Sequence, residues 1–351
     1  MNWYRLMSRR PELAEAAMSA ECRPTWPALP RRGFSFLYRR FNSRQRLMLG
    51  KVPGLLPLYR ALAGRWLTAL GSEDGTVPIR LDRFVFYIDA QEFGNGWVFD
   101  SYEPATTFVF ERMVAAGNVV ADVGAHWGYF TLLAATLCGE TGRVIAFEPY
   151  PRNVSILTKN VHASRLGNID IVPGAVSDRE GFADLFLSHD TSGNSLISVP
   201  PGAKLPPGQC DFLAVRTLAL DDFFASARCT PKLVKIDIEG NELAALDGMR
   251  ELLRKTRDLA LIVELNPFYF PGARGEAFLR RLSDEGFAVA LVDDAKFQLE
   301  TGPAGPVVQS ALAKGYTINL LCTRDGAIDK LLAPQGDLGA PQRPSPRIVR
   351  L

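Results

Sequence analysis

Four acidic residues of this chain stand directly after apolar runs, at the points where buried strands are expected to end. They are Asp122 after residues 119–121, Glu148 after 144–147, Asp237 after 233–236 and Glu264 after 259–263. In an open α/β sheet, groups at the carboxyl ends of the strands face the crevice in which ligands bind. The four carboxylates are therefore predicted to meet at one ligand-binding edge.

One of these acids, Asp237, is followed closely by two more, Glu239 and Glu242, so that three acids lie within six residues. Such acids repel one another unless a proton, Lys235, a bound cation or a cationic ligand neutralises them. A like-charge cluster in a cleft also raises a carboxyl pKa toward the range of a general base. The alternative is that Glu239 and Glu242 are surface acids at the start of a helix over residues 243–253. That explanation suits these two better than it suits Asp237.

A glycine turn lies between the first two of these strand ends. Residues 119–148 predict a strand, a turn with Gly124 and Gly128, a helix over 129–138 and a second strand that ends at Glu148. Glycine accepts a positive φ and has no Cβ, so a ligand can lie against the main chain. A carboxylate at Glu148 could bind both hydroxyls of a ribose, each charged hydrogen bond contributing roughly 1.5–3 kcal/mol. The stretch is typical of a nucleoside site, and the alternative is a purely structural turn.

The spacing of these glycines distinguishes between cofactors. A dinucleotide site requires G-x-G-x-x-G, because the pyrophosphate rests on the helix N-terminus. Here the spacing is G-x-x-x-G, with Ala125 and His126 inside the turn and Asp122 two residues before it. An acid at this point suits a cationic ligand better than a pyrophosphate. S-adenosylmethionine has a sulfonium, an amino group and a ribose but no phosphate, and it fits.

Five segments in order resemble the FkbM family of class I S-adenosylmethionine-dependent methyltransferases. They are DVGAHWGYFTLLAA, FEPYPRNVSILTKNV, AVSDREG, LVKIDIEGNELAALDG and VELNP, and the similarity covers roughly residues 102–266. The resemblance implies a doubly wound α/β fold, Rossmann-like, with a seven-stranded and mostly parallel sheet. It also implies S-adenosylmethionine as cofactor and a small-molecule acceptor.

The resemblance and the turn together predict which residues bind the cofactor. Tyr102 and Glu103 match a Tyr-Glu pair of the family, and Asn153 matches an Asn that the family repeats. Asp178, beside Ser177, is placed by resemblance next to the adenine. The predicted set is Tyr102, Glu103, Asp122, Gly124, Ala125, Gly128, Glu148, Pro149, Asn153, Ser177, Asp178 and Asp237.

Methyl transfer from a sulfonium needs an oriented acceptor and, for a hydroxyl, a base. We expect O-methylation of a hydroxyl on a sugar, polyketide or other small metabolite, with Asp237 or Glu264 as base and His126 as a less favoured candidate. Mg²⁺ on Asp237 and Glu264 is permitted but not required. The predicted substrate contacts are Glu239, Glu242 and Asn266, with His189, Asn194 and Ser195 in a Pro/Gly-rich loop.

The composition of the chain limits its class and its partners. The net charge of the chain is +2, which argues against nucleic acid as an obligatory partner, and its five scattered cysteines predict neither a disulfide framework nor a zinc site. Residues 1–70 hold 13 basic and 3 acidic side chains. They predict a basic helical extension, which either caps the next domain or touches a membrane surface through residues 33–70. A methyltransferase domain over 71–332 and a disordered tail over 333–351 follow. The expected location is cytoplasmic, without a secretory signal and with peripheral contact at the inner membrane surface as an option.

Two other classes of protein remain open at this point. An NAD(P)-dependent Rossmann oxidoreductase would share the strand–turn–helix start, but the glycine spacing and the lack of a Tyr-x-x-x-Lys dyad disfavour it. A non-catalytic membrane-associated binding protein would account for the basic first 70 residues. It would not account for the acids at the strand ends.

Overall fold

The structure is a computed structural model of the full chain. It describes residues 74–81, 84–90, 102–187, 212–270, 273–294, 296–301, 305–306, 308, 317–324, 326, 328 and 347–350. The predicted extension over 1–70, with the membrane contact at 33–70, lies outside these residues, as do His189, Asn194 and Ser195. Among the described residues, no helix has both the length and the apolar character needed to cross a bilayer.

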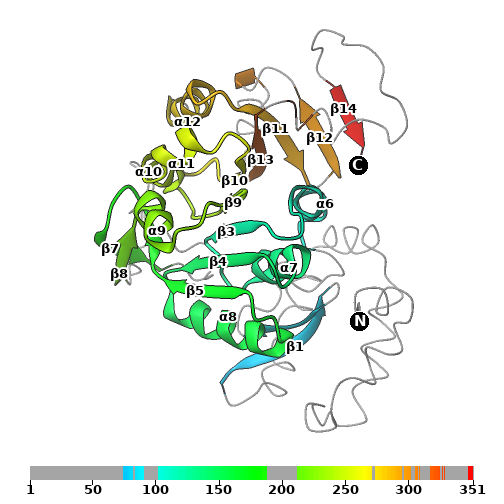
Figure 1. The fold of residues 1–351 in the computed structure, drawn as a ribbon, viewed down its shortest axis with the longest axis vertical. Helices are drawn as coiled ribbons and strands as arrows, with labels where there is room; N and C mark the ends of the chain where they lie inside the picture. Colours follow the sequence, from blue (N-terminus) through cyan, green and yellow to red (C-terminus); the bar gives the residue numbers. More distant parts are fainter. Residues whose placement is uncertain are drawn as a thin grey trace, which may run out of the picture. The chain divides into compact units, whose positions relative to one another are not determined.

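A nine-stranded sheet forms the centre of the described fold (Figure 1), in the order β14-β12-β11-β13-β10-β9-β3-β4-β5. Strands β5, β4, β3, β9 and β10 pair in parallel, and β13 is antiparallel to both β10 and β11. The strand bounds are β3 Val119–Val123, β4 Arg143–Glu148, β5 Ile169–Pro173, β9 Leu233–Ile236, β10 Ala260–Leu265, β11 Ala288–Asp293, β12 Gln298–Thr301, β13 Ile318–Thr323 and β14 Arg347–Arg350.

This arrangement confirms the doubly wound, mostly parallel α/β fold. The seven predicted strands form one continuous block, and β12 and β14 extend it by two strands at one edge. Strand β14 pairs with β12 along residues 347–350, within the segment predicted as a disordered tail. Local strand propensity did not predict β14, because its partner strand β12 lies almost 50 residues away along the chain.

Helices cover both faces of this sheet (Figure 1). One side carries α6 (Pro104–Met113), α7 (Tyr129–Cys138) and α8 (Pro151–Ser164). The other carries α9 (Leu220–Ala227), α10 (Glu242–Asp247), α11 (Arg250–Lys255) and α12 (Ala273–Asp284). Since side chains alternate between the faces of a strand, every second residue of the central strands packs under α9–α12. The intervening residues face α6 and α7.

This alternation decides where the polar residues of the central strands point. Ala121, Val123, Val234 and Ile236 belong to the core beneath α9–α12. Lys235 points to the opposite face of the sheet, and its ammonium lies 4.7 Å from the centre of the Phe130 ring of α7. The charged residues of β3 and β9 therefore gather on the α6/α7 side.

The predicted single helix over residues 243–253 is two short helices, α10 and α11, broken at Gly248. A Cβ on Gly248 would collide with the backbone carbonyl oxygen of Ser177. The segments of Gly248 and Ser177 approach so closely that a residue with a Cβ does not fit at position 248.

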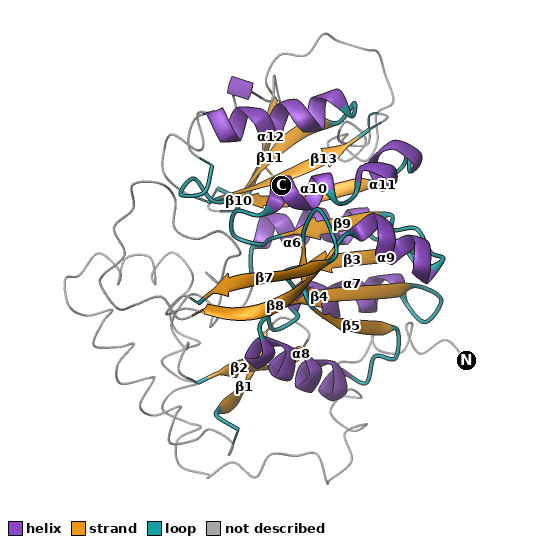
Figure 2. Ribbon diagram, turned by 90° about the vertical axis from the view of Figure 1, so that its left-hand side faces the viewer, coloured by secondary structure: helices purple, strands orange, loops and turns teal. Residues whose placement is uncertain are grey.

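Two small sheets flank the central one (Figure 2). Strands β1 (Thr76–Leu81) and β2 (Phe84–Asp89) pair antiparallel, with Leu81 opposite Phe84. Asn160 of α8 holds the hairpin by hydrogen bonds to both the amide and the carbonyl of Tyr87. The second sheet consists of β6 (Ala175–Val176), β8 (Phe212–Leu218) and β7 (Gly181–Phe186).

Candidate active site

A cavity of about 360 Å³ opens at the carboxyl ends of the parallel strands. This is a size typical of small-molecule sites. Ten of the residues predicted for the site line it: Tyr102, Glu103, Gly124, His126, Glu148, Pro149, Asn153, Asp237, Glu239 and Glu264. The predicted meeting of strand ends is thus realised for Glu148, Asp237 and Glu264.

Gly124 closes the turn after β3 in a way that no other residue type allows. Its φ is +82°, and a Cβ there would collide with the carbonyl oxygen of Asp237. The glycine therefore lets the turn lie directly against the end of β9. Gly128 begins α7 and packs on Leu157 of α8, and it does not line the cavity.

Glu148 is held rigidly beside this turn. One carboxylate oxygen accepts from the amide of His126 at 2.9 Å, and the other from the amide of Tyr150 at 3.0 Å and from Asn153 Nδ2 at 3.2 Å. Burial raises the pKa of Glu148 to about 7, against the lowering effect of these bonds. A carboxylate has about four lone-pair positions, so this one retains acceptor capacity for ligand hydroxyls.

His126 is positioned by the same turn. Its φ is +51°, and its ring lies 4.4 Å from the ring of Trp127. The indole Nε1 of Trp127 donates to Asn153 Oδ1 at 3.1 Å. His126 lines the cavity on the Glu148 side.

Besides Gly128, two further residues predicted to contact the cofactor, Asp122 and Ala125, do not line the cavity. Asp122 is 1% exposed and accepts a 2.5 Å hydrogen bond from the hydroxyl of Thr131, beneath α7. Ala125 is also buried, and its amide donates to the carbonyl of Phe147 at 3.0 Å. Asp122 is thus turned from the turn mouth into the interface between β3 and α7, because side chains alternate along the strand.

The residues predicted to lie beside the adenine, Ser177 and Asp178, also lie outside the cavity lining. Ala175 and Val176 line the cavity, whereas Ser177 and Asp178 do not. Asp178 is exposed and lies 3.5 Å from Arg179. The pairing of β6 with β8 ends at Val176, so the two following residues pass beyond the cavity wall.

Two of the predicted substrate contacts also lie behind the wall. Glu242 is 1% exposed and accepts from the amide of Gly240 at 3.0 Å. Burial raises its pKa to about 8. Asn266 donates to Glu239 at 2.9 Å, so it orients a lining residue without lining the cavity itself.

A cluster of three carboxylates lines the cavity from the side of β9 and β10, whereas Glu148 lines it from the end of β4. Glu103, Asp237 and Glu264 each bring one oxygen within 4.8 Å of the others. Burial raises the pKa of Glu103 to about 7. Burial, and then the charges of Asp237 and Glu103, raise the pKa of Glu264 well above its usual value.

Lys235 partly neutralises this cluster. It is 2% exposed, and its ammonium donates to Asp237 Oδ2 at 2.7 Å. Burial alone would lower the pKa of Lys235, but the charges of Asp237, Glu103 and Asp122 outweigh that effect and raise it. The lysine therefore stays charged.

The donor set of this cluster also fits a hard divalent cation. Mg²⁺ selects carboxylate oxygens, and three are within reach of one point. Glu103 completes a set that the sequence predicted with only Asp237 and Glu264.

Sequence reasoning missed two cavity residues that organise Glu103. Asp294 accepts from the amides of Ala105 and Thr106 at 2.7 and 3.0 Å and so caps α6 from a distant segment. Asn319 donates to Glu103 at 3.2 Å and lies opposite Glu264 in the β10–β13 register. A polar residue within the apolar strand 318–323 was the available signal for Asn319, and no local pattern marks Asp294.

The strand order, the glycine turn and the ligand-facing acids define the class I methyltransferase fold. Within this class, residues 122–289 match the family described as "Methyltransferase FkbM domain". Over this stretch the chain is therefore similar to the FkbM family of methyltransferases.

Individual relatives match over shorter stretches. The hexuronic acid methyltransferase AglP of Haloferax volcanii is 30% identical over 156 residues, 42% of this chain and 56% of that protein. A protein-L-isoaspartate O-methyltransferase of Caenorhabditis elegans is 36% identical over 79 residues, 21% of this chain and 34% of that protein. The chain thus spans less than two thirds of the length of these curated relatives.

Among solved structures, the O-methyltransferase from Bacillus cereus in complex with SAH is similar with a TM-score of 0.36 and 13% identity. That match covers 64% of this chain and 80% of that chain. This similarity is too low to indicate more than the strand order already does.

Proposed function

We propose that this protein transfers the methyl group of S-adenosylmethionine to a hydroxyl of a small, sugar-like acceptor. The observation that carries the proposal is one cavity with two chemically different sides. Glu148 lines it from the end of β4, and the half-buried cluster of Glu103, Asp237 and Glu264 lines it from the side of β9 and β10. The Gly124 turn lies between them, against Asp237.

Each side suits one part of the reaction. S-adenosylmethionine, when bound, supplies a methyl group on a good leaving group. Glu148 would accept from the ribose hydroxyls, and the carboxylate cluster would stabilise positive charge near the methyl group. Orientation of the acceptor in a site that excludes water then supplies most of the catalysis.

The structure supports Glu264 over Asp237 as the base. Asp237 is engaged by the ammonium of Lys235 at 2.7 Å, so its carboxylate is already committed to an ion pair. The raised pKa of Glu264 brings it toward the range of a general base at neutral pH. His126 lies on the Glu148 side of the cavity, which suits a contact to the donor better than proton removal from the acceptor.

A divalent cation remains compatible with the proposal. Glu103, Asp237 and Glu264 would hold Mg²⁺, which would lower the pKa of the acceptor hydroxyl. Activity that survives EDTA would assign proton removal to the protein alone. Loss with EDTA and recovery with Mg²⁺ would assign it to the metal.

The class of acceptor rests on the relatives and on the residue types of the cavity. One matching protein is named for hexuronic acid, which supports a sugar-like acceptor. Side chains such as Glu239 and Asn319 at the cavity wall suit hydrogen bonds to hydroxyls.

The first experiment is calorimetry of the full chain with S-adenosylhomocysteine and with NAD. We expect S-adenosylhomocysteine to bind and NAD not to bind. Glu148→Gln should weaken S-adenosylhomocysteine binding by tenfold or more, since a charged hydrogen bond contributes about 1.5–3 kcal/mol. Glu140→Gln, an exposed acid at the far end of α7, is the matched control. Binding of NAD alone would replace the proposal with a nicotinamide-dependent function.

A second experiment identifies the acceptor. Purified protein with methyl-labelled donor is incubated with a small-metabolite extract and with a panel of monosaccharides. The expected result is label in a product that resists mild alkali, as a methyl ether does and a methyl ester does not.

A further inference from the structure

Asn319 is a polar side chain in an otherwise apolar strand. Its neighbours in β13 from Ile318 to Cys322 are buried, and Asn319 itself is only 6% exposed although it lines the cavity. Asparagine is depleted in strands. Because side chains alternate, Ile318 and Leu320 pack in the core beneath α9–α12, and Asn319 faces the α6 side. The packing of the core therefore does not explain an amide at this position.

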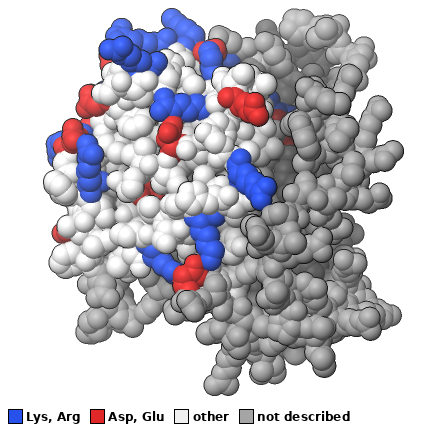
Figure 3. All heavy atoms as spheres, turned by 60° about the horizontal axis from the view of Figure 1, so that its bottom comes forward, with Lys and Arg blue, Asp and Glu red and all other residues white. Residues whose placement is uncertain are grey.

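Only one half of this amide has hydrogen-bond partners. Its Nδ2 donates to Glu103 at 3.2 Å and to Asp294 at 3.4 Å. Its Oδ1 is buried and has no partner among the residues that the structure describes. Charged side chains of both signs are spread over the face drawn in Figure 3, where water reaches them. A buried carbonyl oxygen lacks that partner, and leaving it unpaired lowers the stability of the fold.

The two acids fix the orientation of the Asn319 amide. If the amide were reversed, Oδ1 would lie against the carboxyl oxygens of Glu103 and Asp294. Asp294 already accepts from the amides of Ala105 and Thr106 and from the Thr106 hydroxyl. The carbonyl oxygen therefore stays on the side of the amide that faces away from both acids. Its missing partner must be a hydrogen-bond donor.

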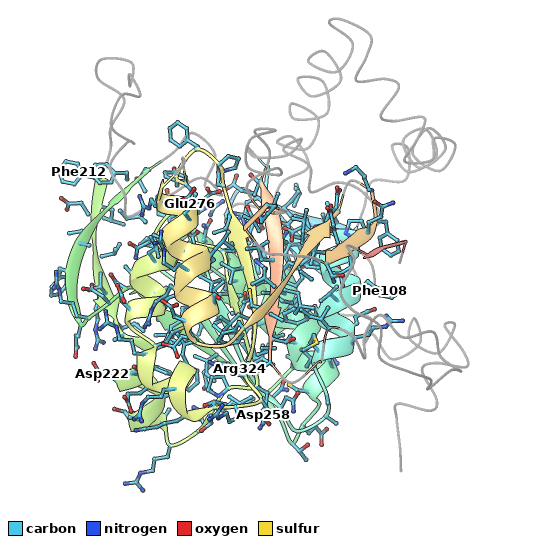
Figure 4. All side chains as sticks on the ribbon, turned by 90° about the horizontal axis from the view of Figure 1, so that it is seen from above. Phe108, Phe212, Asp222, Asp258, Glu276 and Arg324 are labelled. Atoms are coloured by element: carbon cyan, nitrogen blue, oxygen red, sulfur yellow. The ribbon has the colours of Figure 1, made fainter. Side chains whose placement is uncertain are left out.

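Asn319 lies near the start of β13, at the edge of the sheet that carries the cavity. Arg324, just beyond the end of β13, and Asp258, just before β10, lie toward the other edge, at the bottom of Figure 4. Thr317, which precedes Asn319 by two residues, is exposed and also lines the cavity. Directly opposite Asn319 in the β10–β13 register is Glu264. The Cβ atoms of such a pair are about 4.5–5.5 Å apart.

This part of the cavity suits the acceptor better than the methyl donor. Glu148, which we assign to the ribose of the donor, ends β4, and β3, β9 and β10 lie between β4 and β13. The missing partner of Asn319 is therefore best supplied by the acceptor, beside the group that Glu264 contacts.

We propose that Asn319 binds the acceptor, and that the acceptor carries a second hydroxyl or an amine on the carbon next to its reacting hydroxyl. Oδ1 of Asn319 accepts a hydrogen bond from this second group while the reacting hydroxyl faces Glu264. Two directly opposite side chains match two donors on neighbouring carbons. This inference rests on the proposed function. It narrows the acceptor to vicinal diols and amino alcohols, a class that includes sugars.

The first test uses the full chain and does not presuppose a particular sugar. Periodate cleaves the bond between carbons that bear neighbouring hydroxyls, or a hydroxyl and an amine, and leaves isolated hydroxyls intact. One half of a small-metabolite extract is treated with periodate and then with sulfite, and both halves receive S-adenosylmethionine with a labelled methyl group. We expect the treatment to reduce labelled product by about tenfold or more, because a site that binds a hydroxyl rejects molecules without it. A mixture of the two halves controls for inhibition.

The second test addresses the residue itself. Asn319→Ala should reduce the initial rate of label transfer to the untreated extract by about tenfold or more, and the dissociation constant of S-adenosylhomocysteine should stay within about twofold. Asn168→Ala is the matched control. Its amide donates to the carbonyls of Ala135 and Gly139 at the opposite edge of the sheet, and the substitution should change neither quantity.

The labelled products separate binding of the acceptor from support of Glu103. The wild type should give one monomethyl isomer. Asn319→Ala should add the isomer methylated at the neighbouring position, because the two groups are then no longer distinguished. A slower reaction that still gives one isomer would assign Asn319 to Glu103 alone and overturn the inference.

Two further results would overturn the inference: labelled product that withstands periodate, or weaker binding of S-adenosylhomocysteine by Asn319→Ala. The periodate test needs no variant, so it decides even if Asn319→Ala does not fold. A wild type that binds no S-adenosylhomocysteine, or labels nothing in the untreated extract, would instead refute the proposed function. The two failures are therefore distinguishable.

Discussion

The ammonium of Lys235 lies 2.7 Å from the carboxylate of Asp237, two residues further along the chain, and both side chains are on the α6/α7 side of the sheet. The lysine side chain is 3% exposed and that of the aspartate 22%. A buried cation in a central strand is costly unless it is paired. Here its partners are the acids of the cavity, so the fold's stability and the site's charge are linked.

The substitution Lys235→Met should therefore lower the stability of the fold and disturb the charge of the site. Loss of a partner from a buried ion pair costs about 3–5 kcal/mol, and the partial exposure of Asp237 puts the expected loss near the lower value. Chemical denaturation measures it, and methyl transfer should fall together with stability. Lys235→Arg keeps the charge and should retain most of both.

Lys159→Met is the matched control for a half-exposed pair, since Lys159 bridges Asp74 at 2.7 Å on the surface. Its expected effect is below about 1 kcal/mol. Equal losses of unfolding free energy in the two Met variants would contradict the claim that the buried ion pair of Lys235 stabilises the fold more than a surface pair does.

Glu264→Gln should reduce kcat/KM by about 10²–10⁴-fold, the usual contribution of a general base. Affinity for S-adenosylhomocysteine should stay within about twofold, because the base acts on the acceptor. In the wild type, kcat/KM should rise with pH as Glu264 loses its proton, at a pH well above the ordinary glutamate range because its pKa is raised. The variant should lose this rising limb. A variant with full activity would remove Glu264 from the mechanism.

Glu242 provides a test of stability against pH. Its pKa is about 8 in the folded protein and near 4.5 when exposed. The folded state thus holds the proton more tightly, so the stabilising contribution is complete below pH 4.5 and is lost as pH rises to 8. The loss is on the order of 4–5 kcal/mol at 1.36 kcal/mol per pH unit.

Glu242→Gln should flatten that dependence in denaturation curves recorded at pH 5 and pH 8.5. Some dependence should persist, because burial raises the pKa of Glu103 and Glu148 in the same direction. A variant whose stability falls as steeply as that of the wild type would show that Glu242 titrates normally.

Asp294→Ala removes the cap of α6 and should lower the free energy of unfolding by about 1–2 kcal/mol. It should also reduce kcat, because the first turn of α6 positions Glu103. Asp293→Ala is the matched control, since among the described residues Asp293 accepts its side-chain hydrogen bonds from Lys296 of the neighbouring turn. Equal effects of Asp294→Ala and Asp293→Ala would show that the cap of α6 does not contribute to the active site.

Local signals in the sequence determined many element bounds. The predicted helix 129–138 coincides with α7. Gly128 and Gly139 delimit this helix, and Pro151 begins α8, where its missing N–H costs nothing. Such signals act over a few residues, so they can be read without knowledge of the partners. The order of the strand-end acids likewise indicated the ligand edge.

The tertiary structure alone decided which polar residues share a face. Lys235 lies opposite Asp122 in the β3–β9 register, and Asn319 lies opposite Glu264 in the β10–β13 register. A shift of one residue in either pairing would move these side chains to the α9–α12 side. Register depends on contacts between segments more than 50 residues apart. For this reason the sequence indicated the acids, whereas only the folded chain decided that Asp122 lies beneath α7 and that Asp294 and Asn319 complete the cavity.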